Sequence, residues 1–268
     1  SSVCGRCELP SVSVISSATP SASSHFARFL AQPWCEVCAD EWVMAAVLLL
    51  TGFSLVDLIE RIRQMPYPAP VTELFYQTAY FCLIVLLVSP VITMRLFAQE
   101  KASGTFEVLM TAPVGDLPVV VAKFAAAMLF YAAAWLPLPA CLLIVRHFTR
   151  QEAALDLPTL GGMGLGILLV GSLFISLGCF ASSLTRSQMA AAMISFVLGM
   201  SLFALGFLAR IPGQAEWTAQ LFGCFNLFEQ MHDFARGVVD TRAVVFYLSA
   251  TFFFLFLTLR VVESRRWK

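Results

Sequence analysis

The stretch "GLGILLVGSLFISLGCFASSLTRSQMAAAMISF", residues 164–196, carries one charged side chain, that of Arg186. The apolar run before Arg186 extends over 160–184, and the run after it extends over 187–209. A helix needs about 20 mostly apolar residues to cross the hydrocarbon core of a bilayer. We therefore predict two membrane-spanning helices here, joined by a very short turn.

The rest of the chain has the same apolar character. Of its 268 residues, 59% are hydrophobic and 13% are charged, with a mean hydropathy of +0.81. Soluble domains contain roughly 45–50% apolar residues. The 17 basic and 17 acidic residues cancel, so the net charge gives no indication of a nucleic-acid partner. The composition predicts a protein that is embedded in a lipid membrane.

Apolar runs long enough to cross a membrane predict an all-α, multi-pass fold with six transmembrane helices. They cover roughly 42–59, 72–94, 117–145, 160–184, 187–209 and 243–262. The first run is the shortest, and Pro137 and Pro139 are expected to kink the third. Residues 1–24 are rich in serine and are expected to form a flexible tail, and residues 25–268 form the membrane domain.

The distribution of basic residues predicts the orientation of the chain. An even number of spans puts both termini on one side, and that side would then hold ten of the 17 Lys and Arg residues. The C-terminal "ESRRWK" brings Arg265 and Arg266 to this side, and Lys123 begins the third span. Because basic residues are retained on the cytoplasmic side, we expect both termini to be cytoplasmic, with these three residues as interface anchors.

Two CxxC pairs near the start of the chain raise the question of a zinc site. Cys4 and Cys7 form the first pair, and Cys35 and Cys38 form the second. Zinc ribbons usually separate their pairs by about 15–20 residues, and here 27 residues intervene. The second pair also adjoins a predicted span. Reduced thiols are therefore the favoured interpretation, and a zinc site is the alternative.

The sequence lacks the usual signatures of ion-coupled carriers, of P-loop ATPases and of common hydrolases. The interiors of five of the predicted spans contain no Asp, Glu, Lys, Arg or His, although ion-coupled carriers usually keep such residues there. No lysine follows glycine, so the chain lacks the phosphate-binding loop GxxxxGK[ST], and it also lacks HExxH and GxSxG. We expect a non-catalytic subunit without a cofactor of its own.

The segment "FAQEKASGTFEVLMTAP", residues 97–113, interrupts the apolar sequence with charge. On a helical wheel one face is apolar and the other polar, which predicts an amphipathic helix at the inner membrane surface. The apolar face holds Ala102, Phe106, Leu109 and Met110, and the polar face holds Glu100, Ser103, Glu107 and Thr111. Gly104 in the middle costs about 1 kcal/mol relative to alanine. Either a close backbone contact or a break between two short helices would explain this glycine.

Small residues recur in the fourth and fifth predicted spans. They are Gly162, Gly166, Gly171 and Gly178 in the fourth span, and Ser195 and Gly199 in the fifth. Small residues at such spacings allow helix backbones to approach closely. The pattern is compatible with a dimer face and equally with ordinary packing inside one chain.

Three stretches together resemble a known family of membrane proteins. "MRLFAQEKASGTFEVLMTAPVGDLPVVVAKF" (94–124) resembles the inner loop of type-2 ATP-binding cassette (ABC) permeases, with its "SGT-E-L-TAP" pattern and a following Lys. "HDFARGVVDTRAVVFYLSATFFFLFLTLRVVESRRWK" (232–268) is similar to the C-terminal end of the gliding-motility-type branch. The stretch 164–196 resembles the fourth and fifth spans of the same branch. The resemblance covers about residues 42–268.

The resemblance implies a permease subunit of an ATP-driven exporter in the plasma membrane of a bacterium. It would pair with a second permease copy or relative and with cytoplasmic ABC ATPase subunits, which bind the ATP. Short re-entrant helices would lie between the last two spans, near 221–237. The ATPase-coupling segment would be 97–113, with Glu100, Lys101, Gly104, Thr105, Glu107 and Pro113. A non-transporting membrane scaffold of a gliding-type surface machine is the alternative.

Overall fold

The computed structural model describes residues 49, 52, 53, 56, 60, 79–104, 115–139, 157–208 and 227–266. The ordered elements within these ranges are all helices, joined by turns and short irregular segments. They are α4 (Ala79–Thr93), α5 (Ala98–Ser103), α7 (Asp116–Trp135), α9 (Leu157–Leu184), α10 (Gln188–Leu208), α12 (Leu227–Ala235) and α13 (Thr241–Arg266). The predicted all-helical fold is confirmed for this part of the chain.

Five helical segments in the described part are long and apolar enough to cross a membrane. They are Phe81–Ser103, Asp116–Pro139, Thr159–Leu184, Gln188–Gly206 and Thr241–Ser264. These correspond to the second through sixth predicted spans, so the protein is a multi-pass membrane protein. The first predicted span, 42–59, lies almost entirely outside the described residues and stays a prediction.

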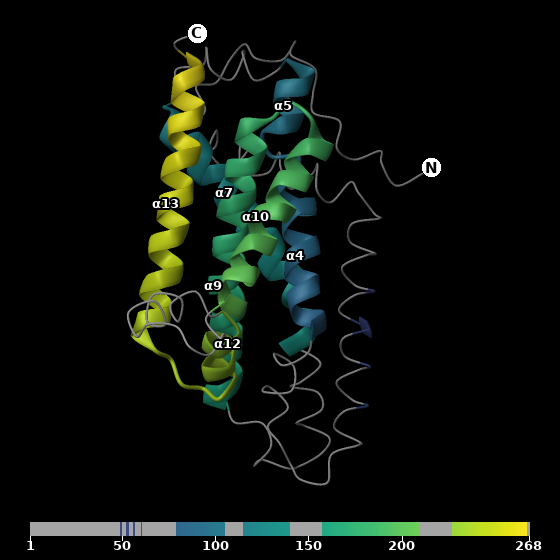
Figure 1. The fold of residues 1–268 in the computed structure, drawn as a ribbon, viewed down its shortest axis with the longest axis vertical. Helices are drawn as coiled ribbons and strands as arrows, with labels where there is room; N and C mark the ends of the chain where they lie inside the picture. Colours follow the sequence, from purple (N-terminus) through teal and green to yellow (C-terminus); the bar gives the residue numbers. More distant parts are fainter. Residues whose placement is uncertain are drawn as a thin grey trace, which may run out of the picture.

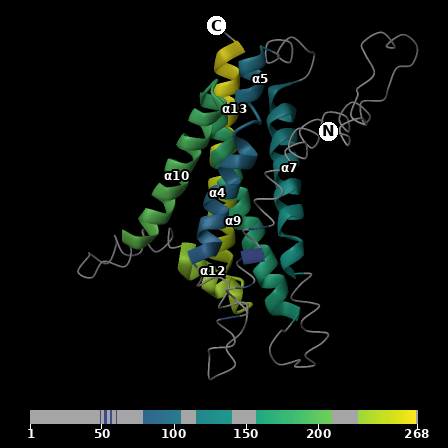
Figure 2. The same ribbon diagram turned by 90° about the vertical axis from the view of Figure 1, so that its right-hand side faces the viewer.

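Helix α9 is the central element of the bundle. It packs against α4, α7, α10, α12 and α13, and the ribbons surround it in two perpendicular views (Figures 1 and 2). In an 18-residue apolar stretch of its span 78% of the residues are buried, against 28% in the corresponding stretch of α10 and 17% in that of α13. The apolar side chains that α10 and α13 expose, such as Val197 and Phe252, suit a hydrocarbon environment.

Glycines let α9 approach three of its neighbours within the same chain. A Cβ atom on Gly171 would lie 2.1 Å from Cε1 of Tyr131 in α7, and one on Gly178 would lie 2.1 Å from Oγ1 of Thr93 in α4. A Cβ atom on Gly162 would lie 2.8 Å from the carbonyl oxygen of Phe234 in α12. At these positions the small residues therefore serve packing inside one chain, which was one of the two interpretations of the pattern.

Helix α7 ends close to where the proline pair predicts a break. The helix stops at Trp135, the Leu136 N–H donates to the Ala133 carbonyl at 3.2 Å, and residues 137–139 form a separate helical turn. Before this break, Tyr131 and Trp135 are buried and their rings meet edge to face with centroids 6.1 Å apart. Residues 140–145 of the predicted span lie outside the described part.

Helix α12 lies at the end of the bundle opposite α5 (Figures 1 and 2). Leu227, Met231 and Phe234 occupy one side of it at helical spacing and are buried, and α12 packs on α9. This helix coincides with the second half of the segment 221–237, for which re-entrant helices are predicted. The described residues show one short amphipathic helix there, and the re-entrant arrangement stays a prediction.

Candidate functional site

The turn from α4 into α5 forms one end of the bundle, near the C-terminal end of α13 (Figure 1). Residues 94–97 make a compact turn, in which the Leu96 N–H donates to the Thr93 carbonyl at 3.2 Å. The Lys101 N–H donates to the Phe97 carbonyl at 3.1 Å at the start of α5. Helix α5 therefore continues closely from the membrane-spanning helix α4 and is not joined to it by a long loop.

Gly104 ends α5, so the amphipathic segment 97–113 is not one continuous helix. Gly104 has φ +76°, in the left-handed region that glycine adopts without a steric cost, and it follows the last helical residue, Ser103. An added Cβ would meet nothing within 4 Å. Of the two explanations for this glycine, the structure supports a helix break and shows no close backbone contact.

The side chain of Ser182 in α9 caps the N-terminus of α5. Its hydroxyl oxygen accepts the N–H groups of Phe97 and Ala98, both at 3.1 Å, and the hydroxyl donates to the Met94 carbonyl at 3.3 Å. The first N–H groups of a helix have no partner inside the helix, and here the residue preceding α5 offers no side-chain cap. Ser182 is fully buried and supplies this cap from another helix.

Lys123 in α7 forms a buried ion pair with Glu100 of α5. Its ammonium nitrogen lies 2.5 Å from Glu100 Oε1 and 2.5 Å from the Leu96 carbonyl oxygen, and it stands 5.1 Å from the centroid of the Phe97 ring. The Lys123 side chain is 7% exposed and that of Glu100 is 28% exposed. Lys123 thus binds anionic and carbonyl partners from the turn after α4 and from α5 inside the bundle, and its expected role as a membrane-interface anchor stays a prediction.

Lys101 ties α5 to the end of α9. Its ammonium group donates a hydrogen bond to the carbonyl oxygen of Ser183, one residue before α9 ends at Leu184. The carbonyl groups at a helix C-terminus lack partners within the helix and carry partial negative charge, so a lysine is favoured there. Glu100 and Lys101, which are expected to pair with charges on a partner protein, both form contacts within this chain, and the partner contact stays a prediction. Ala102, predicted on the apolar face, is exposed.

The remaining predicted site residues are only partly described. Thr105, Glu107 and Pro113 lie outside the described residues, and so do the four N-terminal cysteines of the CxxC pairs. Arg265 and Arg266 belong to the last turn of α13, whose end lies at the same end of the bundle as α5 (Figures 1 and 2). The structure thus brings Glu100, Lys101 and Lys123 into one cluster.

The cluster joins α5 to its neighbours through charged and hydrogen-bonded contacts. The described residues include no set of three or more His, Cys, Asp or Glu side chains that could hold a metal ion. The ties run from one six-residue helix to three membrane-spanning helices, α4, α7 and α9. Any displacement of α5 must therefore move these three helices with it or break the buried contacts.

Replacing Ser182 by alanine is expected to loosen the start of α5. The N–H groups of Phe97 and Ala98 would lose their acceptor at a buried site, which costs about 1–2 kcal/mol. Hydrogen exchange should show faster exchange of these two amides. Ser201→Ala is the matched control, because that exposed hydroxyl only donates to the Leu198 carbonyl of its own helix. Unchanged exchange at Phe97 and Ala98 would contradict the capping role.

A family model described as "ABC-2 family transporter protein" matches residues 59–260, which is more than half of the chain. This range includes all of α4, α5, α7, α9, α10 and α12 and most of α13. No curated protein matches the chain.

Proposed function

Because the chain belongs to the ABC-2 family of transporter membrane proteins, we propose that it is the permease subunit of an ATP-driven exporter. ABC-2 permeases generally pair with ATPase subunits, and the permease domain is typically non-catalytic. In this proposal a separate cytoplasmic chain binds and hydrolyses ATP, and a second permease copy or relative completes the transmembrane part.

The observation that carries the proposal is the attachment of α5 to three membrane-spanning helices. Ser182 caps α5 from α9, Lys123 reaches Glu100 from α7, and a compact turn continues α5 from α4. A surface helix that only filled the membrane interface would need no such buried polar contacts, because water could satisfy its backbone and side chains. We infer that α5 receives the motion of the closing ATPase and passes it to the spans.

The surface that the ATPase contacts begins where α5 turns outward. Ala102, Ser103 and Gly104 are exposed at the end of the helix. In the proposal the adjoining residues Thr105, Glu107 and Pro113 extend this surface, and the half-buried charges of Glu100 and Lys101 hold it in place. This differs from the first expectation, in which those two charges contacted the partner directly.

The resemblance of the C-terminal sequence supports three finer proposals. The similarity of 232–268 to the gliding-motility-type branch suggests that the exporter belongs to that branch. The basic residues of the inner segments, with the anchors Arg265 and Arg266, support cytoplasmic termini. Together they suggest the inner membrane of a bacterium as the location.

A photo-crosslinking experiment tests the proposed contact surface. The photoreactive residue p-benzoylphenylalanine would replace either Ala102 or Val239, which is 52% exposed and lies at the opposite end of the bundle. After purification with the ATPase encoded beside this chain, crosslinking should join the ATPase to position 102 and not to position 239. Crosslinking at 239 alone, or co-purification of no ATPase at all, would refute the proposal and favour a scaffold.

A further inference from the structure

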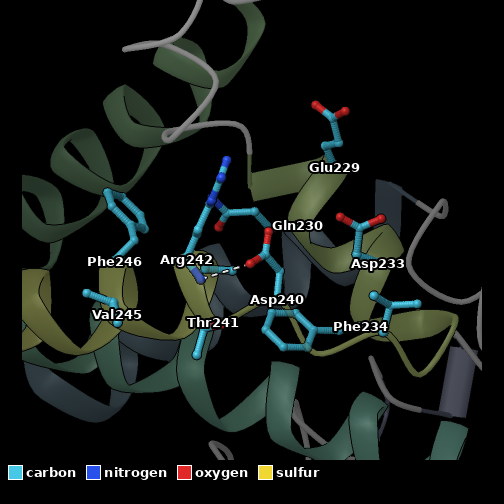
Figure 3. Close-up of a pocket in the computed structure, with 11 residues that line it drawn as sticks. Glu229, Gln230, Asp233, Phe234, Asp240, Thr241, Arg242, Val245 and Phe246 are labelled. Carbon is cyan, nitrogen blue, oxygen red and sulfur yellow. Dashed lines mark hydrogen bonds between the residues drawn. The ribbon is translucent and has the colours of Figure 1, made fainter.

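A large pocket lies between α12 and the start of α13, at the end of the bundle opposite α5 (Figure 3). Its volume is about 1030 Å³, which is large enough for the head group of an amphiphile and the first atoms of its chains. One wall comes from α12 and the other from residues 238–246. Nothing in the coupling role of α5 uses this pocket.

The walls of the pocket are held rigidly by backbone contacts. The Gly237 N–H donates to the Phe234 carbonyl at 3.1 Å, and the Val238 N–H donates to the Asp233 carbonyl at 3.0 Å. Gly237 has φ +75°, which only glycine adopts readily, and it turns the chain from α12 toward α13. Phe234 is 1% exposed, and its carbonyl lies against Gly162 of α9. The pocket is therefore part of the packed fold.

The pocket combines both signs of charge. Glu229, Asp233 and Asp240 supply carboxylates, and Arg242 supplies a guanidinium. The Asp240 Oδ1 atom accepts the Arg242 backbone N–H at 2.9 Å and so caps α13. Among the described residues the Arg242 guanidinium forms no ion pair. Figure 3 shows Arg242, Glu229 and Asp233 projecting to the same side of the ribbon.

The pocket lies beside the start of the candidate membrane span in α13. The candidate span of this helix begins at Thr241, which itself lines the pocket. Further along α13 toward its C-terminus, one face of the helix exposes apolar side chains at helical spacing, and the first of these side chains also lines the pocket. They are Val245 at 62%, Leu248 at 44%, Phe252 at 72% and Phe256 at 50% exposure. A charged pocket thus continues into an apolar track.

The geometry points to a binding site for the zwitterionic head group of an amphiphile that carries a phosphate and an amine. The Arg242 guanidinium can bind a phosphate through paired charge-assisted hydrogen bonds, and the Asp233 and Glu229 carboxylates can bind the ammonium group. The acyl chains follow the apolar track on α13. A purely anionic head group would lie beside the Asp233 carboxylate, and a purely cationic one would lie beside the Arg242 guanidinium.

Such a head group has two sources, the phospholipid of the surrounding bilayer and an exported amphiphile. If the ligand is a phospholipid of the bilayer, the inference is independent of the proposed function. If the ligand is an exported amphiphile, the inference rests on the proposed export.

Native mass spectrometry of the purified full-length protein tests the site. The probes are phosphatidylethanolamine and phosphatidylglycerol with identical acyl chains. The wild type should retain the first lipid more strongly than the second. Arg242→Gln removes the paired hydrogen bonds to the phosphate and should lower retention of phosphatidylethanolamine at least about tenfold, which is roughly the factor for a single charge-assisted hydrogen bond. Asp233→Asn should remove the preference between the two lipids.

The control is Arg186→Gln, which removes an exposed arginine from the turn between α9 and α10, away from the residues that line the pocket. This variant should bind both lipids as the wild type does. Equal retention of the two lipids by the wild type, or unchanged retention by Arg242→Gln, would overturn the site. The amphiphile that co-purifies identifies the source, since phosphatidylethanolamine indicates the bilayer and another zwitterionic amphiphile indicates a transported molecule.

Discussion

Replacing Lys123 by methionine is expected to destabilise the protein by about 3 kcal/mol, toward the lower end of the range for breaking a buried ion pair. The change leaves the Glu100 carboxylate and the Leu96 carbonyl without the ammonium group that now binds both at 2.5 Å. The value lies low in the range because the Glu100 side chain keeps 28% exposure to solvent. Thermal or denaturant unfolding in detergent measures the loss.

Two further variants make the Lys123 prediction specific. The double variant Glu100→Gln/Lys123→Met should be more stable than Lys123→Met alone, because no charge then remains without its partner. Arg260→Gln breaks the ion pair with Glu263, whose side chains are 63% and 37% exposed, and should cost at most about 0.5 kcal/mol. If Lys123→Met and Arg260→Gln lower the free energy of unfolding equally, the buried ion pair stabilises the fold no more than the exposed pair does.

Replacing Gly178 by alanine is expected to force α4 and α9 apart. The new Cβ would lie 2.1 Å from Oγ1 and 2.7 Å from Cβ of Thr93, which is fully buried and hydrogen-bonded to the Ser89 carbonyl at 2.8 Å. Overpacking of this kind costs about 1–3 kcal/mol, and we expect the upper end because the clash involves an atom next to the backbone. The unfolding midpoint in detergent should fall accordingly.

The same substitution elsewhere on α9 provides the control. A Cβ on Gly164 meets nothing within 4 Å, so Gly164→Ala should leave the stability unchanged or raise it through better helix propensity. Adding Thr93→Gly to Gly178→Ala removes all three clashing atoms and should restore part of the loss. If Gly178→Ala and Gly164→Ala unfold alike, the close approach of α4 and α9 does not stabilise the fold.

The membrane-spanning helices could be predicted because apolar length alone decides them. Helix α10 covers 188–208 where 187–209 was expected, and α9 ends at Leu184 as expected. Helix α13 extends to Arg266, beyond the predicted 262, because helical hydrogen bonding continues past the apolar stretch into the basic end. Hydropathy detects the membrane boundary and not the last helical turn.

The candidate site shows what sequence patterns cannot supply. Sequence patterns drew attention to Glu100, Lys101 and Lys123, but they did not predict the contacts that these side chains form between helices. Which way a lysine on α7 or α5 points depends on how the helices are rotated against each other, and no local pattern contains that information. Ser182 was missed for the same reason, although a polar residue near the end of a long apolar helix is a usable signal for a contact between helices.

The helix break at Gly104 could be predicted only in part from the sequence. Glycine destabilises the interior of a helix, which indicated that Gly104 has another role. In the structure Gly104 lies at the end of α5 with φ +76°. The helical wheel drawn through Gly104 was nevertheless wrong, since it assumed one continuous helix. A glycine within a short amphipathic pattern is therefore better taken as a possible helix boundary before any wheel is drawn.

The central claim, that α5 drives the spans through its buried contacts, is tested most directly by fluorescence energy transfer in the complex with the ATPase. Fluorophores introduced as non-natural amino acids at Val121 in α7 and Met193 in α10 would report the distance between two exposed helix faces. In the wild type, ATP should change the transfer efficiency. In Ser182→Ala and Glu100→Gln/Lys123→Met complexes, the ATPase should stay bound and hydrolyse ATP while this change is lost. The same ATP-dependent change in both variants as in the wild type would contradict the account.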